Sequence, residues 1–442
     1  MAAANADHAA PEPEPELDTG QPGWQLTLYA VWCGQILALI GFSMRVPFLP
    51  FYLADLGVTD LQGQTLWSGA INAVGAAAMM VTSPLWGIMA DRYGRKPMLL
   101  RGLFGGAAMV ALMGFATTPW QLAALRVGEG LLTGTVAASA ALVATSAPRH
   151  RLGYALGMVQ TAVFAGAAGG PLLGGFIYDW VGARAAFWFA GAMLFAGGIV
   201  VALFARENFA RAPRQPMSES ETGRWRRLQD SSAFLFTAIM LTMLAAIFVI
   251  RMVAMSMQPI IPLFVEQLTP HNPEVATVAG IVLGAAGFTS ALAAAYFGRL
   301  GDRTGHHRVL AYSLCAAGLL YLPMALVRDP WQLAILQGLL GIALGGLIPS
   351  ANALIAQYTP LEKRGAVFGL TASLSGLGGF VGPLLGAVLA TSLGFRATFI
   401  AAGLLLLAVA VLVIWSLRTA ASERPAAERA GSGSGHQRKA AL

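Results

Sequence analysis

The stretch Gly87-Ile-Met-Ala-Asp-Arg-Tyr-Gly-Arg-Lys96 lies between two long apolar segments. A weaker copy, Gly298-Arg-Leu-Gly-Asp-Arg-Thr-Gly-His-His307, follows 211 residues later. Each copy is a charged turn, punctuated by glycine, at the end of an apolar segment. The pair therefore indicates a duplicated bundle of helices whose two halves move against each other.

The composition is that of a membrane protein. Of the 442 residues, 56% are hydrophobic and 11% are charged, whereas soluble domains have roughly 25% charged residues. The apolar runs have the length of about 20 residues that a helix needs to cross a bilayer core of ~30 Å. Cys33 and Cys315 lie in apolar segments, so no disulfide framework is expected, and the six histidines lack metal-ligand spacing.

Twelve apolar segments can be drawn in two sets of six. The first set covers 25–50, 66–90, 98–116, 119–146, 153–178 and 184–206, and the second covers 233–262, 275–300, 309–327, 330–357, 365–392 and 395–418. We predict an all-α membrane protein with a disordered cytoplasmic tail at 1–24, a six-helix bundle at 25–206, a cytoplasmic linker at 207–232, a second bundle at 233–418 and a disordered cytoplasmic tail at 419–442.

The basic residues predict the orientation. Of the 28 Lys and Arg residues, 22 lie in or beside the loops after helices 2, 4, 6, 8 and 10 or in the C-terminal tail. The loops of the other side hold Arg184, Arg328 and Arg396. Because short cytoplasmic loops carry the excess of Lys and Arg, both termini are expected to be cytoplasmic. The same rule explains the net charge of +7 without a nucleic-acid partner.

The duplication extends through most of both halves. At offsets of 211 or 212 residues, Pro47-Phe-Leu-Pro50 matches Pro259-Ile-Ile-Pro262, Pro119-Trp-Gln-Leu-Ala matches Pro330-Trp-Gln-Leu-Ala, and Gly170-Pro-Leu-Leu-Gly174 matches Gly382-Pro-Leu-Leu-Gly386. Such regularity predicts two pseudo-symmetric bundles related by an axis along the membrane normal.

The fourth segment carries two charges, Arg126 and Glu129, that share one helical face. Burial of either charge alone is costly, so we expect a pair or a water-filled cavity. Glu129 is the only Asp or Glu inside the twelve segments as drawn, so if the protein is a proton-driven exporter, Glu129 is the first candidate to carry the proton, with Arg126 as its switch. Asp55 is the second candidate. The alternative is a permanent, purely structural pair.

Together these features resemble the major facilitator superfamily, in particular its 12-helix drug:proton antiporter branch, over residues 25–418. The resemblance implies the major facilitator fold, a location in the bacterial inner membrane, and export of small molecules in exchange for protons by alternating access. It also implies energy from the proton gradient without a cofactor. Small molecules, protons and the lipid bilayer are the expected partners, and we expect the protein to work as a monomer. No nucleophile–base cluster, metal set or phosphate loop suggests an enzyme.

The resemblance assigns roles to two motifs. The first is a latch that holds the halves together in one access state, made of Gly87, Asp91, Arg92, Gly94, Arg95, Lys96, Asp302 and Arg303. Asp91 would accept hydrogen bonds from a facing helix N-terminus, although the neighbouring cations could simply set the topology. His306 and His307 replace Arg-Lys in the second copy, which predicts a weaker latch there. The second motif is the helix-5 antiporter signature, with Gly166, Gly170, Pro171, Gly174 and Gly175; its alternative is ordinary helix packing.

Helices 1, 4 and 7 line the cavity in this superfamily. Candidate substrate contacts are Arg45, Arg251, Asn72, Phe42, Gln160 and Met255, with Asn352, Gln357, Met44, Trp67 and Met257 as further candidates. Three arginines beside one carboxylate would favour anionic or zwitterionic substrates. The alternative is that Arg45 and Arg251 snorkel to the outer interface.

Three other functions stay open. The same machinery could export one dedicated metabolite such as a siderophore. A proton-coupled importer is disfavoured by the helix-5 motif. A non-transporting membrane receptor would not need the repeat, the paired latch motifs or an intramembrane carboxylate.

Overall fold

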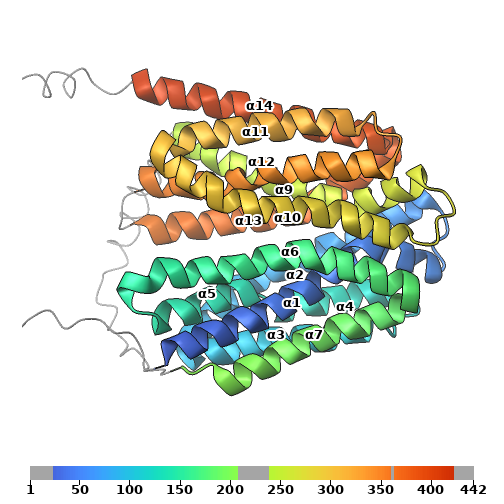
Figure 1. Cartoon of the computed structure of the whole chain (residues 1–442), viewed down its shortest axis with the longest axis horizontal. Coiled ribbons are helices and arrows are strands. Elements are labelled where there is room, and N and C mark those ends of the chain that lie inside the picture. The colour runs from blue at the N-terminus through green and yellow to red at the C-terminus, as the bar shows by residue number, and fades with distance from the viewer. Residues whose placement is uncertain (1–22, 208–237, 360–362, 423–442) are drawn as a thin grey trace, which may run out of the picture.

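The structure is a computed structural model that describes residues 23–207, 238–359 and 363–422. Its helices in the first part of the chain are α1 (Trp24–Asp55), α2 (Leu61–Tyr93), α3 (Arg95–Met113), α4 (Pro119–Leu132), α5 (Thr135–Ser146), α6 (Leu152–Val181) and α7 (Ala183–Phe204). Those in the second part are α9 (Ala238–Leu268), α10 (Val275–Thr304), α11 (His306–Met324), α12 (Pro330–Tyr358), α13 (Arg364–Leu393) and α14 (Phe395–Ser422). Figure 1 shows them running side by side along the long axis of the molecule.

The twelve-helix prediction is confirmed. Each predicted apolar segment coincides with one helix, except that α4 and α5 share one segment. Among the described residues, eleven units are long and apolar enough to span a membrane, and α11 is not one of them. It aligns with α3 in the repeat and coincides with the predicted apolar segment 309–327. The predicted tails and linker fall largely outside the described residues.

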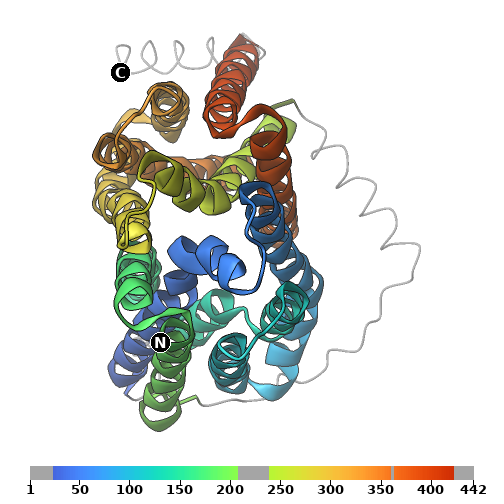
Figure 2. The same cartoon turned by 90° about the vertical axis from the view of Figure 1, so that its right-hand side faces the viewer.

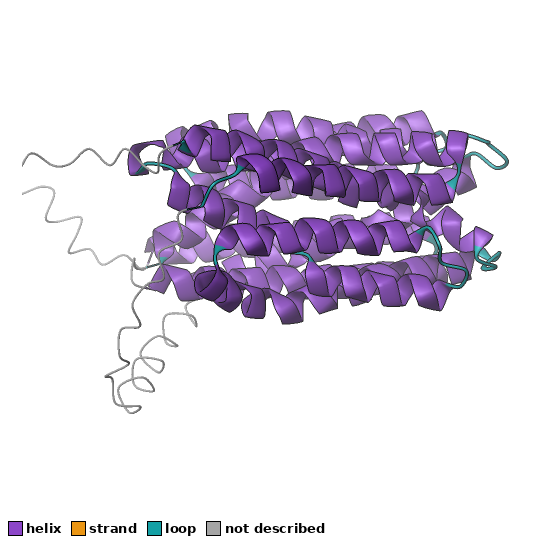
Figure 3. Cartoon of the chain, turned by 90° about the horizontal axis from the view of Figure 1, so that it is seen from below, coloured by secondary structure: helices purple, strands orange, loops and turns teal. Residues whose placement is uncertain are grey.

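The helices form two bundles, here called the N-half (α1–α7) and the C-half (α9–α14). Viewed along the helices, the blue-to-green N-half lies on one side and the yellow-to-red C-half on the other (Figure 2). Within the described part of the chain, helices and connecting loops account for the whole fold (Figure 3). The halves meet where α6 packs on α10 and where α13 packs on α2.

Glycine faces set the packing inside each half. On α6, Gly166, Gly170 and Gly174 lie against α1, and a Cβ atom at Gly174 would overlap the carbonyl of Met44. On α13, Gly378, Gly382 and Gly386 lie in the same way against α9. The two sets are 212 residues apart, so the repeat in the sequence is a repeat in the packing. Small residues allow this close approach of helices in a membrane.

The fourth span is broken, contrary to the single segment 119–146 that the sequence predicts. The chain leaves α4 at Thr133 and starts α5 after Gly134, whose φ is 116°, a conformation that favours glycine. Two carbonyl groups freed by the break find donors. Trp86 Nε1 donates to the Leu131 carbonyl at 2.7 Å, and Arg101 Nη2 donates to the Thr133 carbonyl at 3.2 Å. A broken helix is tolerated within a membrane where such partners satisfy its backbone.

The matching helix in the C-half, α12, is continuous. Phe297 and Tyr312 stand at the repeat positions of Trp86 and Arg101. Phe297 has no hydrogen-bond donor in its side chain, and Tyr312 has a single hydroxyl in place of a guanidinium. The break and the side chains that satisfy it therefore occur together, in the N-half alone.

The two ends of the bundle differ in how closely the halves approach. We call the end with the α2–α3 and α10–α11 connections the basic end and the other the opposite end. At the opposite end, Gly175 of α6 packs on the Ala276 carbonyl, and Gly280 of α10 packs on that of Pro171. At the basic end, a Cβ at Gly87, Gly153, Gly298 or Gly369 would meet nothing within 4 Å. The halves therefore contact across the opposite end and separate toward the basic end.

Candidate functional site

A buried charge cluster lies in the N-half, formed by Arg45 of α1 and by Arg126 and Glu129 of α4. Arg45 Nη1 donates to Glu129 Oε1 at 3.0 Å, and Arg126 Nη1 lies 2.7 Å from Glu129 Oε2. Glu129 is 2% exposed and Arg45 is 8% exposed. Glu129 follows Pro119 by ten residues, which places it about 15 Å along the helix from the opposite end.

Helix packing brings the cluster together. Arg126 and Glu129 are neighbours on one face of α4 because they are three residues apart. α4 approaches α2 closely where Gly130 meets the Gly75 carbonyl, and Gly75 leaves the space that the Arg126 guanidinium occupies. The expected Arg126–Glu129 pair is present. The sequence did not predict that Arg45 joins this pair. Arg45 binds Glu129 inside the bundle rather than extending toward the outer interface.

Two arginines and one glutamate give the cluster a formal charge of +1. Glu129 bonds both partners as a carboxylate, so its protonation would remove the charge that holds both ion pairs. Removing one member of a buried ion pair leaves an uncompensated charge, which is strongly unfavourable. Proton uptake at Glu129 therefore has to be accompanied by movement of at least one arginine or by water entry.

A second cross-helix contact joins the halves at the opposite end. Asp179, near the end of α6, accepts hydrogen bonds from the backbone N–H groups of Ala276 at 3.3 Å and Thr277 at 2.6 Å. These groups belong to the first turn of α10, where a helix favours an anion. Asp179 stands four residues after Gly175, the last glycine of the helix-5 motif. Its carboxylate therefore links the N-half to the C-half through hydrogen bonds to α10.

The first copy of the predicted latch divides into two parts. Asp91 and Arg92 are exposed, and Asp91 has no hydrogen bond to any other described residue. Gly94, with φ of 101°, makes the turn into α3. The backbone N–H groups of Arg95 and Lys96 donate to Glu207 at 2.7 and 2.8 Å. Sequence reasoning missed Glu207, which lies after α7 and has no periodic relation to the motif.

The remaining latch residues are also placed within their own halves. Lys96 Nζ donates to the carbonyls of Ala202 and Ala205 at the end of α7, at 2.9 and 2.7 Å. In the second copy, Asp302 lies 3.2 Å from His306 Nε2, and Arg303 is exposed. No hydrogen bond or ion pair between the two halves involves these residues within the described part of the chain. Their role as a latch stays a prediction.

Two of the predicted cavity residues line one pocket. Arg251 of α9 and Asn352 of α12 face a space of about 250 Å³ that α13 closes with Phe368, Thr371 and Ser375. Arg251 therefore lies inside the C-half, near the middle of α9, rather than at the outer interface.

Other predicted cavity residues lie elsewhere. Phe42, which we predicted to face the substrate cavity, instead packs its ring into the space beside Gly106 of α3, next to Leu194. Asn72 donates to the Ser68 carbonyl of its own helix at 3.0 Å, and Gln160 is exposed. Met255 lies beside Gly382 of α13. None of the four lines the Arg251 pocket.

The further candidates are also scattered. Met44 and Met257 are buried in the hydrophobic core, and Trp67 packs edge-on against Trp120. Gln357 is exposed on α12.

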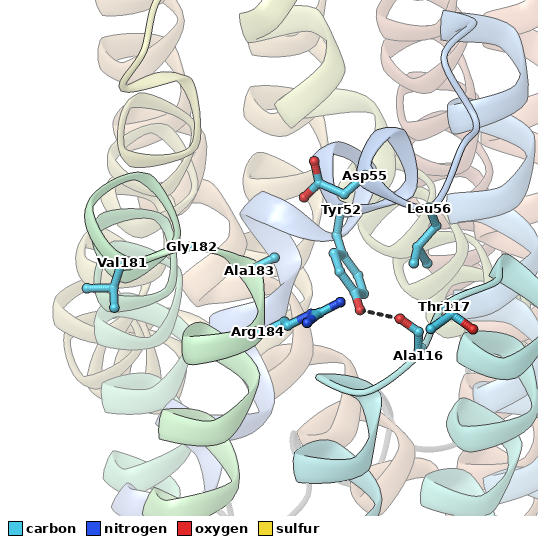
Figure 4. A pocket seen from close by; sticks show the side chains of 9 residues that line it. All are labelled: Tyr52, Asp55, Leu56, Ala116, Thr117, Val181, Gly182, Ala183 and Arg184. Atoms are coloured by element: carbon cyan, nitrogen blue, oxygen red, sulfur yellow. Dashed lines mark hydrogen bonds between the residues drawn. The ribbon is translucent and has the colours of Figure 1, made fainter.

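Asp55 does not meet Glu129. It lines a separate pocket of about 470 Å³ at the opposite end, together with Tyr52 and Arg184 (Figure 4). The Tyr52 hydroxyl reaches the carbonyls of Met113 and Ala116, at 3.2 and 2.9 Å. The predicted second proton carrier is thus spatially distinct from the first.

The arrangement defines the class of protein: a multi-pass helical membrane protein of two pseudo-symmetric halves with charges buried at mid-membrane. The sequence profile of the Major Facilitator Superfamily matches residues 31–279 and 243–440. The chain belongs to this superfamily, and it is a membrane transporter rather than an enzyme.

Relatives cover nearly the whole chain. Multidrug resistance protein MdtG of Serratia proteamaculans is 35% identical over 395 residues, which are 89% of this chain and 94% of the relative. MdtG of Salmonella paratyphi A is 37% identical over 384 residues, 87% of this chain and 93% of the relative.

Solved structures show the same fold at lower identity. A bacterial homologue of the human lysosomal transporter Spinster, in an inward-facing and occupied conformation, is 14% identical with a TM-score of 0.72, over 90% of this chain and 98% of that chain. The human organic anion transporter MFSD10 is 20% identical with a TM-score of 0.66, over 89% of this chain and 100% of that chain.

Proposed function

We propose that the protein is a proton-driven exporter of several small molecules, located in a bacterial inner membrane and working as a monomer. The observation that carries the proposal is the Arg45–Glu129–Arg126 cluster, which is buried at membrane depth in a chain of this superfamily. Intramembrane ionisable groups of this kind are typical of proton relays in transporters. The names of the MdtG relatives, as multidrug resistance proteins, support the substrate range.

In this proposal the basic end faces the cytoplasm, as do both termini. The described structure then corresponds to a state that is open to the cytoplasm and closed outside, with Asp179 holding α10 at the outer end. In this state Asp91 is exposed and has no hydrogen bond to another described residue. When the halves rock to the outward-open state, Asp179 releases α10 and Asp91 engages a helix N-terminus of the C-half.

Glu129 couples this movement to protons. In the described state, both arginines neutralise the carboxylate. Arg45 is on α1 and Arg126 on α4, so a shift of α1 against α4 would separate Arg45 from Glu129 and let the carboxylate take up a proton from outside. Return to the inward-open state restores both pairs and releases the proton to the cytoplasm.

The test is proton movement in vesicles that contain purified Glu129→Gln protein. Substrate-driven proton flux should disappear, because the amide cannot carry a proton, while the protein stays folded and inserted. The matched control is Glu274→Gln, which makes the same change at an exposed residue. Normal coupling in the Glu129→Gln protein would remove Glu129 from the carrier role.

A growth screen tests the range of substrates. Overexpression should raise resistance to several unrelated toxic compounds, and deletion should lower it. A defect confined to iron-poor medium would instead indicate a dedicated siderophore exporter.

A further inference from the structure

The C-half contains a membrane-embedded arginine without a counter-charge. Arg251 lies near the middle of α9, and no hydrogen bond or ion pair joins its side chain to any other described residue. Arg45 and Arg126, by contrast, share Glu129. A charged side chain inside a membrane protein is costly and normally pairs or lines a substrate path. The unpaired state of Arg251 therefore calls for an anion from outside the chain.

Among the described residues, those around Arg251 include no acidic group to supply that charge. The pocket of about 250 Å³ is lined by no Asp or Glu. α12 and α13, which form its other walls, contain no Asp or Glu between their first and last residues. The only acidic residue on α9 is Glu266, fifteen residues after Arg251, which corresponds to about 22 Å along the helix.

The pocket also offers an apolar surface and neutral polar groups. Its walls are mostly apolar, with Ile247, Ile348 and Phe368 among them, and it includes the side chains of Asn352 and Ser375. Neither polar side chain has a hydrogen bond to another described residue. A few convergent polar groups in an apolar wall are typical of small-molecule sites.

We propose that this pocket is an anion-binding subsite for amphipathic organic anions. The guanidinium of Arg251 binds the anionic group, with the Asn352 amide and the Ser375 hydroxyl as further donors, and the apolar body of the ligand packs on Ile247, Ile348 and Phe368. That the ligand is an exported substrate rests on the proposed function, whereas the binding itself does not.

The position of the pocket agrees with loading from the cytoplasm. Its residues on α12 and α13 belong to the parts of these helices nearer the basic end, where the halves separate. The Glu129 cluster lies in the other half and retains a formal charge of +1. No described group in the pocket would compensate a cationic ligand.

The experiment compares three probes with one naphthyl body: 1-naphthaleneacetate, 1-naphthaleneacetamide and 1-naphthylmethylammonium. Their binding to the full chain in lipid nanodiscs is measured by equilibrium dialysis without a proton gradient, with empty nanodiscs subtracted. We expect the acetate to bind at least about tenfold more tightly than the acetamide, and the ammonium to bind most weakly. Arg251→Gln should reduce the acetate-to-acetamide ratio to about one without changing acetamide binding, and Arg251→Lys should keep a preference for the anion.

Arg328→Gln is the matched control, because it removes an exposed arginine far from the pocket and should leave the ratio unchanged. Equal binding of the acetate and the acetamide, or no binding of the acetate at about 1 mM, would overturn the proposal. Glu129→Gln separates the two hypotheses, since it should abolish proton coupling while the preference for the anion remains.

Discussion

The N-half and the C-half share their glycine faces but differ in their buried polar groups. Gly166, Gly170 and Gly174 pack on α1 as Gly378, Gly382 and Gly386 pack on α9. The cluster of Arg45, Arg126 and Glu129, however, has Met257, Gln337 and Leu340 at its repeat positions. The C-half instead holds Arg251, whose repeat position in the N-half is Leu39. The two halves have therefore kept the same glycine packing faces, whereas their buried charged residues differ.

This difference suggests a division of labour. In the N-half, both buried arginines pair with Glu129, which we propose as the proton site. In the C-half, Arg251 has no partner among the described residues, and we propose that it binds the substrate. This division predicts that exchanging residues between equivalent positions removes one function at a time.

The largest effect is expected when the cluster is broken at one residue. Glu129→Leu leaves Arg45 and Arg126 buried without a counter-charge, which should cost about 3–5 kcal/mol of stability. The triple variant Arg45→Met, Arg126→Gln, Glu129→Leu installs the residues of the C-half at all three positions. It should regain most of the stability, because apolar replacement of a buried ion network is often neutral. Thermal unfolding in detergent measures both variants.

A triple variant no more stable than Glu129→Leu would show that the residues of the C-half cannot replace the charge cluster of the N-half. Proton flux provides the second readout, and neither variant should show any.

A smaller effect is expected from a methyl group on the shared glycine faces. In Gly174→Ala the methyl would overlap the backbone carbonyl of Met44, whereas in Gly386→Ala the nearest atom is the Ser256 carbonyl oxygen at 2.7 Å. Overpacking typically costs about 1–3 kcal/mol, and we expect Gly174→Ala to lie at the upper end and Gly386→Ala at the lower. Gly369→Ala, with open space around it, is the control. Equal melting temperatures for the first two variants would show that the faces are interchangeable.

The sequence predicted the fold more completely than the site. Span length and the 211-residue repeat are properties of whole segments, so an error at a single residue does not change them. The break after Thr133 was missed because Gly134 aligns with Gly345, which lies within a continuous helix. Only the donors Trp86 and Arg101, from other helices, distinguish the two glycines.

For the site, helical spacing predicted Arg126 beside Glu129 but not Arg45. The two residues of the Arg45–Glu129 pair are 84 positions apart and lie on different helices. The repeat gave no help, since the C-half has no charges at the equivalent positions. Glu207 was missed for a similar reason: its contact with Arg95 and Lys96 depends on where the end of α7 lies in space.

An effect of about 1 kcal/mol is expected at the contact between the halves. Asp179→Asn removes the negative charge from the N-terminus of α10, an interaction of this size, and should shift the population toward separation at the opposite end. Spin labels at positions 181 and 271, in a background without Cys33 and Cys315, report the distance between the halves by pulsed EPR. The control is Asp60→Asn, because Asp60 caps the N-terminus of its own helix α2 through Gly63. Longer distances in the control as well would show that the effect is not specific to the contact between the halves.

The smallest effect is expected where the two halves use different side chains to hydrogen-bond loop carbonyls at the opposite end. In the C-half, Arg396 donates to the carbonyls of Ala325 and Val327, both at 3.1 Å. In the N-half, Tyr52 reaches the carbonyls of Met113 and Ala116, and Ala116 is the counterpart of Val327. Arg184, the counterpart of Arg396, lines the neighbouring pocket. Phe264 stands at the repeat position of Tyr52 and has no hydroxyl.

Tyr52→Phe therefore makes the N-half resemble the C-half at this position, and we expect Arg184, which lines the same pocket, to donate to the freed carbonyls. Figure 4 shows its guanidinium directed toward the Tyr52 hydroxyl. The single variant should lose less than about 1 kcal/mol, whereas Tyr52→Phe with Arg184→Ala should lose more than the sum of the single changes, as expected for residues that share partners. Thermal unfolding of the double-mutant cycle measures the difference. Additive losses would mean that Arg184 does not replace the hydroxyl, and that the two halves satisfy these carbonyls by independent routes.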